Sequence, residues 1–381
     1  MFSRTLRLRT ASWTSRTCAR SPVNLYYSTV ASKTRPKTVF SGIQPTGIPH
    51  LGNYLGALAN WVKLQNGASP DDRLLYSIVG WHALTLPQDP KALRAARWEM
   101  LASLLATGLD PRRSIIFHQD HNPNHTELAW ILNCLCPIGK LKRMTTWKAK
   151  LAASRNANDE SEVDESLLNA GLFTYPVLQA ADILAYRATH VPVGEDQQQH
   201  LELARDIADS FNRAFPKPKK IFPLPQHMIP PSKRILSLRD PSSKMSKSSP
   251  DVQSRILLTD EFAQIQAKFR SAVTDSQLGV TFDPVNRPGV SNIVTILATC
   301  TDKSSEMVAE LYTSKGHAQL KMDTAEAVES LLRQPREEFK RLKSETGYLE
   351  EIAKEGARRA REISEGTMTL VRSQIGLAQS T

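Results

Sequence analysis

Two short segments, far apart in the chain, carry residue types suited to binding anions. The first, residues 41 to 53, reads SGIQPTGIPHLGN and lies between an apolar extended run and a helical pattern. The free backbone N–H groups at a helix N-terminus attract anions, and glycine lets a flat or charged group approach the main chain closely. The segment contains neither the G-K-[ST] of a Walker loop nor a G-x-G-x-x-G fingerprint, and by itself it could be only a tight turn.

The second segment is a loop bounded by Pro241 and Pro250, in which Lys244 and Lys247 stand three positions apart with Ser246 between them. Lysine ammonium groups and serine hydroxyls offer positive charge and hydrogen-bond donors to a polyphosphate. An isolated loop of this composition is usually a solvated surface loop. The presence of both segments in one chain favours phosphate chemistry over either structural explanation.

Both segments are similar to the paired signatures of the class I aminoacyl-tRNA synthetases. His50-Leu51-Gly52-Asn53 resembles the HIGH signature, and Lys244-Met245-Ser246-Lys247-Ser248 resembles the KMSKS signature. Three further blocks resemble the tryptophanyl branch of this family, mitochondrial type: FSGIQPTG at 40–47, GLFTYPVLQAADIL at 171–184 and VPVGEDQQQH at 191–200. The resemblance extends from about residue 38 to the helical C-terminus. Gln179 stands where bacterial relatives tend to have Met, and Gly80-Trp81-His82 where they have Asp-x-His.

The resemblance implies a ligase reaction in two steps. The carboxylate of L-tryptophan attacks the α-phosphorus of ATP, giving tryptophanyl-adenylate and pyrophosphate, and the aminoacyl group then passes to mitochondrial tRNA(Trp). Such a displacement depends mainly on positioning and on neutralising the charge of the leaving pyrophosphate. Mg²⁺ would arrive as Mg-ATP, bound through the phosphates and without a metal ligand from the protein. The resemblance gives the catalytic roles to Lys244, Lys247, His50 and Gln44.

The same resemblance implies a set of ATP contacts. Gly194, Glu195 and Asp196 would approach the ribose, and Ile235 would contact adenine through its backbone, although Gly-Glu-Asp on local sequence alone reads as a surface turn. The implied ATP-binding set is Gln44, Pro45, Thr46, Gly52, Asn53, Gly194, Glu195, Asp196, Ile235, Lys244, Met245, Ser246, Lys247 and Ser248.

Amino-acid selection is expected to depend on Asp182. The indole ring has one polar group, its N–H donor, so a pocket that admits tryptophan and excludes phenylalanine needs a buried acceptor. Asp182 is a lone carboxylate in the apolar segment ADILAY and fits that need; the structural alternative is an ion pair with Arg187. The resemblance adds Phe40, Gly42, Val191 and Val193 around the ring, Tyr175 and Gln197 at the α-amino group, and His82 in a loop beside the substrate.

The elements that must position these residues alternate along the chain. Apolar runs at 38–43, 74–79 and 114–117 predict strands, and helical patterns run from 51 to about 65 and onward from Pro90. This order predicts an α/β fold with a parallel sheet covered on both faces, the Rossmann-like catalytic domain that the resemblance implies. Six prolines between 215 and 231 predict a connector, and the polar stretch 154–166 predicts a surface loop.

The last third of the sequence has a different character. Amphipathic patterns near 261–272, 304–312, 324–343 and 348–370 predict a C-terminal α-helical domain, which the resemblance assigns to the tRNA anticodon. Residues 251–381 contain 17 Lys and Arg against 19 Asp and Glu, so attraction to tRNA must come from local clusters such as Arg358, Arg359 and Arg361. The expected domains are therefore 1–37, 38–250 and 251–381.

The N-terminal segment explains most of the net charge of +11. Residues 1–37 carry eight Lys and Arg and no Asp or Glu, and they are rich in Ser and Thr. This composition, without a long apolar run, is typical of a mitochondrial presequence and predicts a location in the mitochondrial matrix. The alternative is a disordered basic tail that contacts RNA.

The remaining observations limit cofactors and partners. Cys18, Cys134, Cys136 and Cys300 lack the spacing of a zinc ribbon and are expected to be buried reduced thiols. No segment reaches the roughly 18 to 20 apolar residues of a membrane span, so no membrane partner is expected. The resemblance implies a homodimer. Three alternatives stay open: a tyrosyl-tRNA synthetase of the same fold, a non-catalytic RNA-binding relative, and a nucleotidyltransferase that uses the same turn.

Overall fold

The computed structural model describes residues 35–154, 166, 168–192, 194, 197–228, 234–247 and 249–378. Residues 36–381 form one compact unit. The expected presequence and surface loop lie outside the described residues almost entirely, and so do four expected site residues, Val193, Glu195, Asp196 and Ser248.

A five-stranded sheet lies at the centre of this unit, with the strand order β3-β2-β1-β4-β5. The strands are β1 Thr38–Ile43, β2 Arg73–Ile78, β3 Ile115–His118, β4 His190–Pro192 and β5 Gln226–Met228. Every neighbouring pair is parallel. The parallel sheet and its first three strands confirm the prediction, whereas β4 and β5 were not predicted. The chain order reverses beside β1, and a parallel sheet offers its ligand crevice at the carboxyl ends of the strands at such a point.

Side chains of the strands alternate between two hydrophobic cores, one on each face of the sheet. Val39 and Tyr76 belong to the first core, together with Leu58 and Leu101 from the helices on that face. Phe40 belongs to the second core, on the opposite face. A sheet buried on both faces has nearly continuous apolar strands, as the runs LLY and IIF in this sequence show.

The first face is covered by helices that follow β1 and β2. They are α1 Leu51–Asn53, the π-helical turn η1 Tyr54–Leu58, α2 Ala59–Gly67 and α4 Pro90–Ala106. The short helix α3 Gly80–Ala83 also follows β2, but it has no residue in the core on this face and contacts η2 instead. The helix predicted from 51 to about 65 is therefore present, with a π turn inside it. Helix α4 starts at Pro90 as predicted, because proline suits the first helical turn and the Asp89 carboxylate accepts from the N–H of Ala92 at 2.7 Å.

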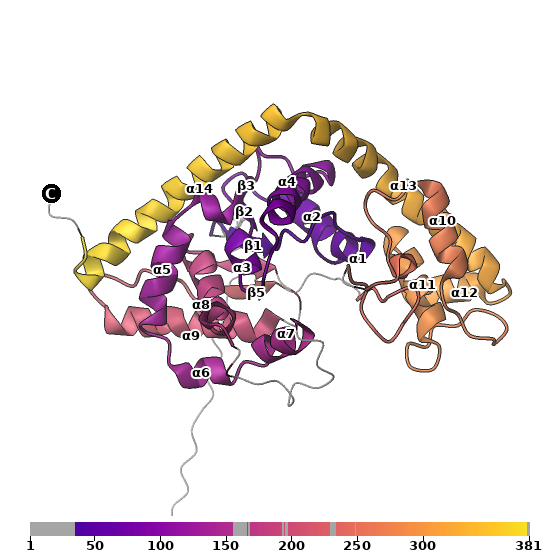
Figure 1. Cartoon of the computed structure of the whole chain (residues 1–381), viewed down its shortest axis with the longest axis horizontal. Helices are drawn as coiled ribbons and strands as arrows, with labels where there is room; N and C mark the ends of the chain where they lie inside the picture. Colours follow the sequence, from indigo (N-terminus) through magenta and orange to yellow (C-terminus); the bar gives the residue numbers. More distant parts are fainter. Residues whose placement is uncertain are drawn as a thin grey trace, which may run out of the picture. The chain divides into compact units, whose positions relative to one another are not determined.

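Helices of the second group follow β3 and β4. They are the 3-10 turn η2 Gln119–His121, α5 Asn124–Asn133, α6 Ile138–Lys142, α7 Thr146–Ser154, α8 Ala170–Leu184 and α9 Gln198–Ala214. Helix α8 carries Asp182 and packs against α5 and α9 (Figure 1). The predicted connector 215–231 contains no helix among its described residues, and it contributes the short strand β5.

The C-terminal part is helical, as predicted. It contains η6 Val252–Ser254, α10 Phe262–Ser271, α11 Pro288–Cys300, α12 Ser305–Tyr312, α13 His317–Ser344 and α14 Thr346–Ile375. Helix α11 was not predicted, and α13 begins seven residues earlier than expected. Helices α10 and α11 both pack against α13.

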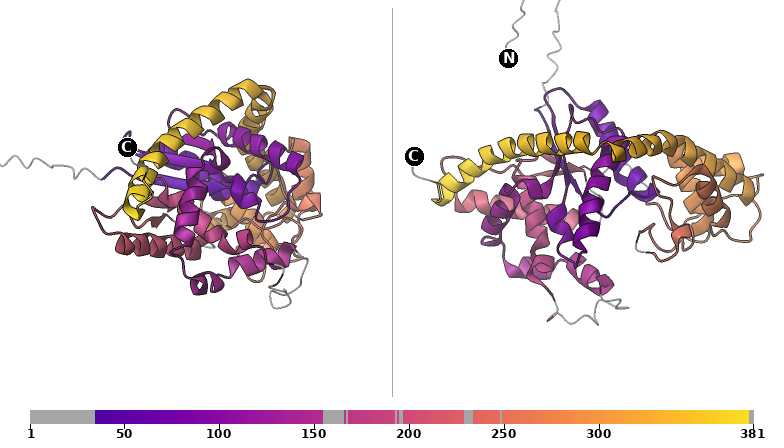
Figure 2. Two further views of the ribbon diagram at one scale, coloured as in Figure 1. Left: turned by 60° about the vertical axis from the view of Figure 1, so that its left-hand side comes forward. Right: turned by 45° about the horizontal axis from the view of Figure 1, so that its top comes forward.

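Helix α14 does not stay with the other C-terminal helices. It runs back along the catalytic part and packs against α4, β3 and α5 (Figures 1 and 2). Gly356 makes the contact with β3 possible, since a Cβ atom there would lie 1.8 Å from the carbonyl oxygen of Ile116. The last described helix therefore covers the edge strand of the sheet.

Candidate active site

The turn after β1 leads directly into α1, and His50 caps that helix. Its Nδ1 atom accepts from the backbone N–H of Asn53, and its own backbone N–H donates to Asn53 Oδ1, both at 3.2 Å. Such reciprocal bonds satisfy amide groups that a helix N-terminus otherwise leaves unpaired. The segment that follows the lysines also holds the turn, because the N–H of Leu51 donates to the carbonyl oxygen of Ile256 at 2.7 Å. The HIGH-like segment is thus fixed from both sides.

The lysine loop, of which residues 244–247 are described, lies against this turn. Lys247 Nζ donates to the carbonyl oxygens of Thr46 at 2.9 Å and Gly47 at 2.8 Å. The other end of the loop is held by a bond from the N–H of Met245 to the carbonyl oxygen of Ile235 at 3.1 Å. The two segments that the sequence suggested as anion sites, about 200 positions apart, therefore meet at the carboxyl end of β1.

Burial and neighbouring positive charges lower the pKa values of His50 and Lys247. Burial lowers the pKa of His50 to about 4, and the charges of Lys247, Arg255 and Lys244 add to the effect. His50 is therefore neutral at pH 7, and its proton lies on Nε2 because Nδ1 accepts from Asn53. Burial also lowers the pKa of Lys247 to about 8, with Glu99 acting in the opposite direction. A lysine with this pKa remains mostly cationic at neutral pH.

A cavity of about 690 Å³ lies beside the contact between the two segments. It is lined by residues of both segments and by the connection between them, and nine of the expected ATP-binding residues belong to it. The lining consists of Thr46, His50, Gly52, Asn53, Gly56, Gly194, Arg234, Ile235, Lys244, Met245, Ser246 and Lys247. Two expected residues lie elsewhere: Gln44 lines the neighbouring cavity, and Pro45 lines neither.

A second cavity of about 320 Å³ lies beside β1 and α8 and brings together the residues expected around tryptophan. Seven of the eight expected residues line it, and the eighth, Val193, is not described. The lining consists of Phe40, Ser41, Gly42, Gln44, Val79, His82, Lys150, Tyr175, Gln179, Asp182, Ile183, Val191 and Gln197. His82 belongs to the short helix α3 and is buried, which corrects the expected loop position.

Asp182 is buried at the wall of this cavity, with 1% of its surface exposed. His82 Nε2 lies 2.8 Å from its Oδ2 atom, and His125 Nδ1 and Gln119 Nε2 lie 2.6 and 2.7 Å from Oδ1. The description of Asp182 as a lone carboxylate is therefore wrong. The ion pair with Arg187 is wrong as well, because Arg187 is an exposed residue of the turn after α8.

The three donors explain why a buried carboxylate can stay ionised. Burial by itself would raise the pKa of Asp182, but the hydrogen bonds from His125 and His82 outweigh it and lower the pKa to about 2. Gln119 is oriented as a donor because its Oε1 accepts from the backbone N–H of Trp81 at 3.0 Å. The cavity therefore presents a fixed anionic acceptor.

Tyr175 and Gln197 are connected through a residue that was not predicted, His200. The Tyr175 hydroxyl lies 2.9 Å from His200 Nε2 and donates to Thr146 Oγ1 at 2.6 Å. His200 Nδ1 lies 2.9 Å from Gln197 Oε1. The two side chains expected at the α-amino group thus belong to one hydrogen-bond network, in which Tyr175 and His200 are buried and Gln197 is half-buried.

Other residues of the site had no recognisable sequence signal. Lys150 Nζ lies 3.9 Å from the centre of the Tyr175 ring and lines the smaller cavity. It sits in α7 among other lysines, and nothing in its spacing distinguishes it. Gln119 lies in η2 and His125 is the second residue of α5, and no pattern in the sequence connects either with Asp182.

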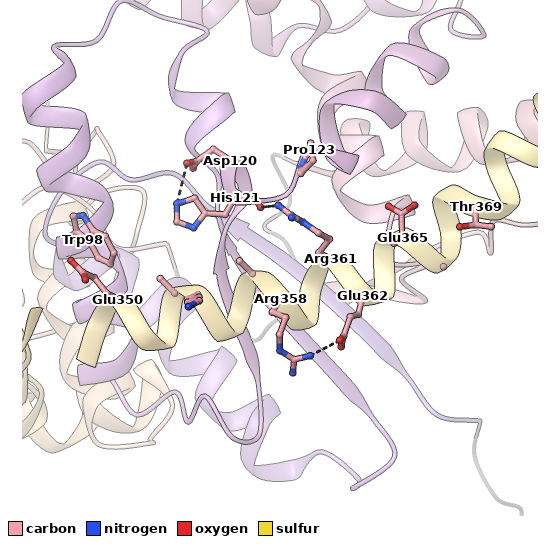
Figure 3. Close-up of a pocket in the computed structure, with 14 residues that line it drawn as sticks. Trp98, Asp120, His121, Pro123, Glu350, Arg358, Arg361, Glu362, Glu365 and Thr369 are labelled. Atoms are coloured by element: carbon pink, nitrogen blue, oxygen red, sulfur yellow. Dashed lines mark hydrogen bonds and ion pairs between the residues drawn. The ribbon is translucent and has the colours of Figure 1, made fainter. Parts of the chain in front are cut away.

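A third cavity lies elsewhere in the molecule. It measures about 1120 Å³ and lies between α14, Trp98 of α4 and the segment around η2 (Figure 3). Some of its charged groups are engaged: Arg358 pairs with Glu362, and Arg361 Nη2 donates to the carbonyl oxygen of His121 at 2.7 Å. It shares no lining residue with the two cavities at β1.

Three cysteines, Cys134, Cys136 and Cys300, lie in the described part of the chain, and Cys18 lies outside it. Cys136 is buried and Cys300 half-buried, but Cys134 is exposed, which corrects the expectation of buried thiols; all three are free. The described residues contain no group of three or more His, Cys, Asp or Glu that could hold a metal ion. Within the same residues, no helix is long and apolar enough to cross a bilayer.

Known proteins share both the sequence and the fold. The family model described as "tRNA synthetases class I (W and Y)" matches residues 32–333. A mitochondrial tryptophan–tRNA ligase of Schizosaccharomyces pombe is 42% identical over 346 residues, which cover 89% of this chain and 95% of that protein.

Solved structures agree with the sequence comparison. A tryptophanyl-tRNA synthetase from Mycoplasma pneumoniae superposes with a TM-score of 0.78 at 32% identity, covering 90% of this chain and 98% of that one. An enzyme of the same name from Campylobacter jejuni, solved as a complex with ADP and tryptophan, gives a TM-score of 0.72 at 32% identity and covers 89% and 100% of the two chains. Sequence, fold and the paired anion-binding segments agree, and this chain belongs to the class I tRNA synthetases of the tryptophan and tyrosine family.

Proposed function

We propose that this chain is a mitochondrial tryptophan–tRNA ligase. It joins L-tryptophan to the α-phosphate of Mg-ATP, releases pyrophosphate, and transfers the aminoacyl group to mitochondrial tRNA(Trp) in the matrix. The observation that carries the proposal is the buried carboxylate of Asp182, held by three donors at the wall of a cavity between Phe40 and Val191. The names of the relatives at 42 to 44% identity support the same substrate.

Asp182 supplies the selectivity. A carboxylate offers about four acceptor positions, and the three donors described above use three of them. The remaining position, on Oδ2, accepts the indole N–H, while Phe40, Gly42 and Val191 contact the ring. Phenylalanine has no donor to offer, and a site built around a buried acceptor can reject such an analogue by about 10⁴ to 10⁵.

The larger cavity binds ATP beside the amino acid. The tryptophan carboxylate attacks the α-phosphorus in line with the leaving pyrophosphate, so that one P–O bond forms as another breaks. Lys244 and Lys247, with the hydroxyls of Ser246 and Ser248, neutralise the charge that develops on the pyrophosphate. In the free protein Lys247 bonds to two neutral carbonyl oxygens, and anionic phosphate oxygens replace these because charge-assisted bonds are stronger.

The remaining sites follow the family. His50 lies near the α-phosphate, Gln44 lies between the two cavities, and Gly194, Glu195 and Asp196 hold the ribose. Residues 38–250 carry the chemistry, and residues 251–381 meet the tRNA anticodon. Residues 1–37 direct the protein to the matrix. Two chains associate as a homodimer, and the exposed apolar side chains of Trp130 and Ile138 on α5 and α6 support such an interface.

The decisive experiment is amino-acid-dependent exchange of labelled pyrophosphate into ATP by the full chain. Tryptophan should support exchange, and tyrosine and phenylalanine should not. Exchange that depends on tyrosine would identify the tyrosine enzyme of this fold. RNA binding without any exchange would identify a non-catalytic relative. Sedimentation of the same sample tests the homodimer.

A further inference from the structure

A continuous line of buried hydrogen bonds connects the C-terminal helix to the tryptophan cavity. Asn122 Nδ2 donates both to Ser364 Oγ of α14 and to the Tyr186 hydroxyl, each at 3.0 Å. The Tyr186 hydroxyl lies 2.6 Å from His125 Nε2, and His125 Nδ1 lies 2.6 Å from Asp182 Oδ1. These five side chains, which we call the relay, are each at most 2% exposed.

The direction of every bond in the relay follows from one backbone group. The N–H of Asn124 donates to Asn122 Oδ1 at 3.3 Å, so the oxygen of the Asn122 amide faces that group and its nitrogen faces Ser364 and Tyr186. An amide nitrogen can only donate, and the Tyr186 oxygen must therefore accept from it. Among the described residues the Tyr186 hydroxyl proton then finds its acceptor in His125 Nε2 at 2.6 Å, since the other neighbour of the oxygen is the Asn122 donor.

This arrangement determines the tautomer of His125. Its Nε2 atom accepts from Tyr186, so the neutral ring carries its proton on Nδ1 and donates it to Asp182. Burial raises the pKa of Tyr186, which keeps its phenol protonated and able to donate. With the opposite tautomer, the lone pair of Nδ1 would face the carboxylate, and Asp182 would lose a donor.

Ser364 closes the relay at the far end. Its hydroxyl donates to the carbonyl oxygen of Arg361 at 3.1 Å, which leaves its lone pairs for the amide groups of Asn122 and Asn124 at 3.0 and 2.9 Å. His125 does not line the tryptophan cavity, whereas His82 does. The relay therefore reaches Asp182 from the side that substrate does not occupy.

We propose that Tyr186 and Ser364 are positioning residues for tryptophan recognition: through Asn122 and His125 they hold the Asp182 carboxylate in the orientation that accepts the indole N–H. The proposal rests on the proposed function, and it makes helix α14 part of the amino-acid selection. Neither residue contacts the substrate, and both act through Asp182.

The test compares tryptophan with an analogue in which sulfur replaces the indole N–H group. Pyrophosphate exchange by the full chain gives kcat and KM for both. In Tyr186→Phe the KM for tryptophan should rise about fivefold, the factor typical of one lost hydrogen bond. The preference for tryptophan over the analogue should fall by the same factor, while kcat and the KM for ATP stay within about twofold. Ser364→Ala should shift the preference in the same direction by about twofold, because Asn124 still orients Asn122.

Matched controls separate positioning from loss of packing. Tyr76→Phe removes an equally buried hydroxyl, bonded to the carbonyl oxygen of Trp61 at 3.2 Å on the other face of the sheet. Ser103→Ala removes a buried serine hydroxyl from α4. Both controls should keep the wild-type preference. Nitrogen NMR should show His125 protonated at Nδ1 in the wild type and as a mixture of tautomers in Tyr186→Phe.

The possible results distinguish failure of the proposed function from failure of the positioning role. A wild-type enzyme without tryptophan-dependent exchange overturns the proposed function. An active wild type whose folded Tyr186→Phe variant keeps the full preference for tryptophan overturns the positioning role, and so does His125 protonated at Nε2. Should Tyr186→Phe not fold, an unchanged preference in Ser364→Ala overturns it instead.

Discussion

The ammonium group of Lys247 donates a 2.8 Å hydrogen bond to the carbonyl oxygen of Gly47. This bond joins the lysine loop to the turn after β1, and it holds the cation at the wall of the cavity of about 690 Å³, where we propose that the ATP phosphates bind. In the free enzyme burial lowers the pKa of Lys247 to about 8. Lys247 therefore loses its positive charge within a pH range in which the enzyme can be assayed.

The pH dependence of the activity should reveal the deprotonation of Lys247. Lysine is cationic below its pKa, so kcat/KM for ATP, which reports the free enzyme, should fall as the pH rises through about 8. Bound phosphates favour the charged lysine, and kcat should stay flat over the same range. Lys247→Arg, which keeps its charge, should remove the fall near pH 8 at the cost of a lower rate. A fall of the same shape in Lys247→Arg would contradict the assignment.

Glu99 of α4 should tune the same lysine. Its Oε2 atom would lie 3.8 Å from a Cβ atom on Gly47, and its Oε1 atom lies 3.3 Å from Lys343 Nζ near the end of α13. Glu99 carries a negative charge beside the ATP cavity, and Lys343 partly offsets it. Well below pH 8, where Lys247 stays cationic although the loss of Glu99 lowers its pKa further, Glu99→Gln should therefore lower the KM for ATP, and Lys343→Met should raise it, each by about two- to threefold at low salt.

A double variant, Glu99→Gln with Lys343→Met, tests whether Lys343 acts through Glu99. With Glu99 already neutral, Lys343→Met should have no further effect on the KM for ATP. Lys340→Met provides the control, because Lys340 is another ion-paired lysine of α13, bonded to Glu261 and Glu337. Shifts of equal sign in the two single variants would show that Glu99 and Lys343 act independently.

Replacement of the indole acceptor should alter selectivity. In Asp182→Asn the amide must turn its NH₂ group toward at least one of the donors His82, His125 and Gln119, which leaves two donors facing each other. The preference for tryptophan over phenylalanine should fall by at least about tenfold. Asp260→Asn changes a buried carboxylate in the C-terminal part, where it pairs with Lys268, and should keep the preference. Unchanged discrimination in Asp182→Asn would argue against the acceptor role.

Two glycines of α14 should respond to alanine in opposite ways. At Gly356 the added Cβ would overlap the carbonyl oxygen of Ile116, and the helix would have to move off β3; we expect a loss of about 3 kcal/mol or more. At Gly366 nothing lies within 4 Å, and alanine should stabilise the helix by about 0.5 to 1 kcal/mol. Thermal unfolding of both variants measures the difference. Equal melting temperatures would show that α14 does not pack tightly against the sheet.

The sequence predicted those parts of the fold that have a strong local pattern. Strands β1 to β3 are apolar runs bounded by turns, and α4 has Pro90 at its start. Helix α11 was missed because it is buried on nearly all sides from Gly289 to Ala298, and a helix without a polar face shows no amphipathic period. Strands β4 and β5 contain three residues each, too few for a pattern.

The residues of the site likewise divide into those that the sequence indicates and those that only the fold brings together. Asp182 could be recognised as an acceptor because a carboxylate in an apolar segment needs an explanation. Its partners could not, since His82 and Gln119 lie 100 and 63 positions away and only the fold brings them to it. The resemblance predicted residues that line the two cavities, whereas the side chains bonded to those residues, such as His125 and His200, follow only from three-dimensional packing.

The position of α14 has a consequence for folding during synthesis of the chain. A ribosome releases the N-terminal part first, so the edge of the sheet at Ile116 emerges long before the helix that covers it. A chain that stops after α13 would contain both signature segments and every residue that lines the two cavities at β1, yet it would leave β3 uncovered. We expect such a truncated protein to aggregate or to be degraded, and late nonsense mutations to be as harmful as early ones.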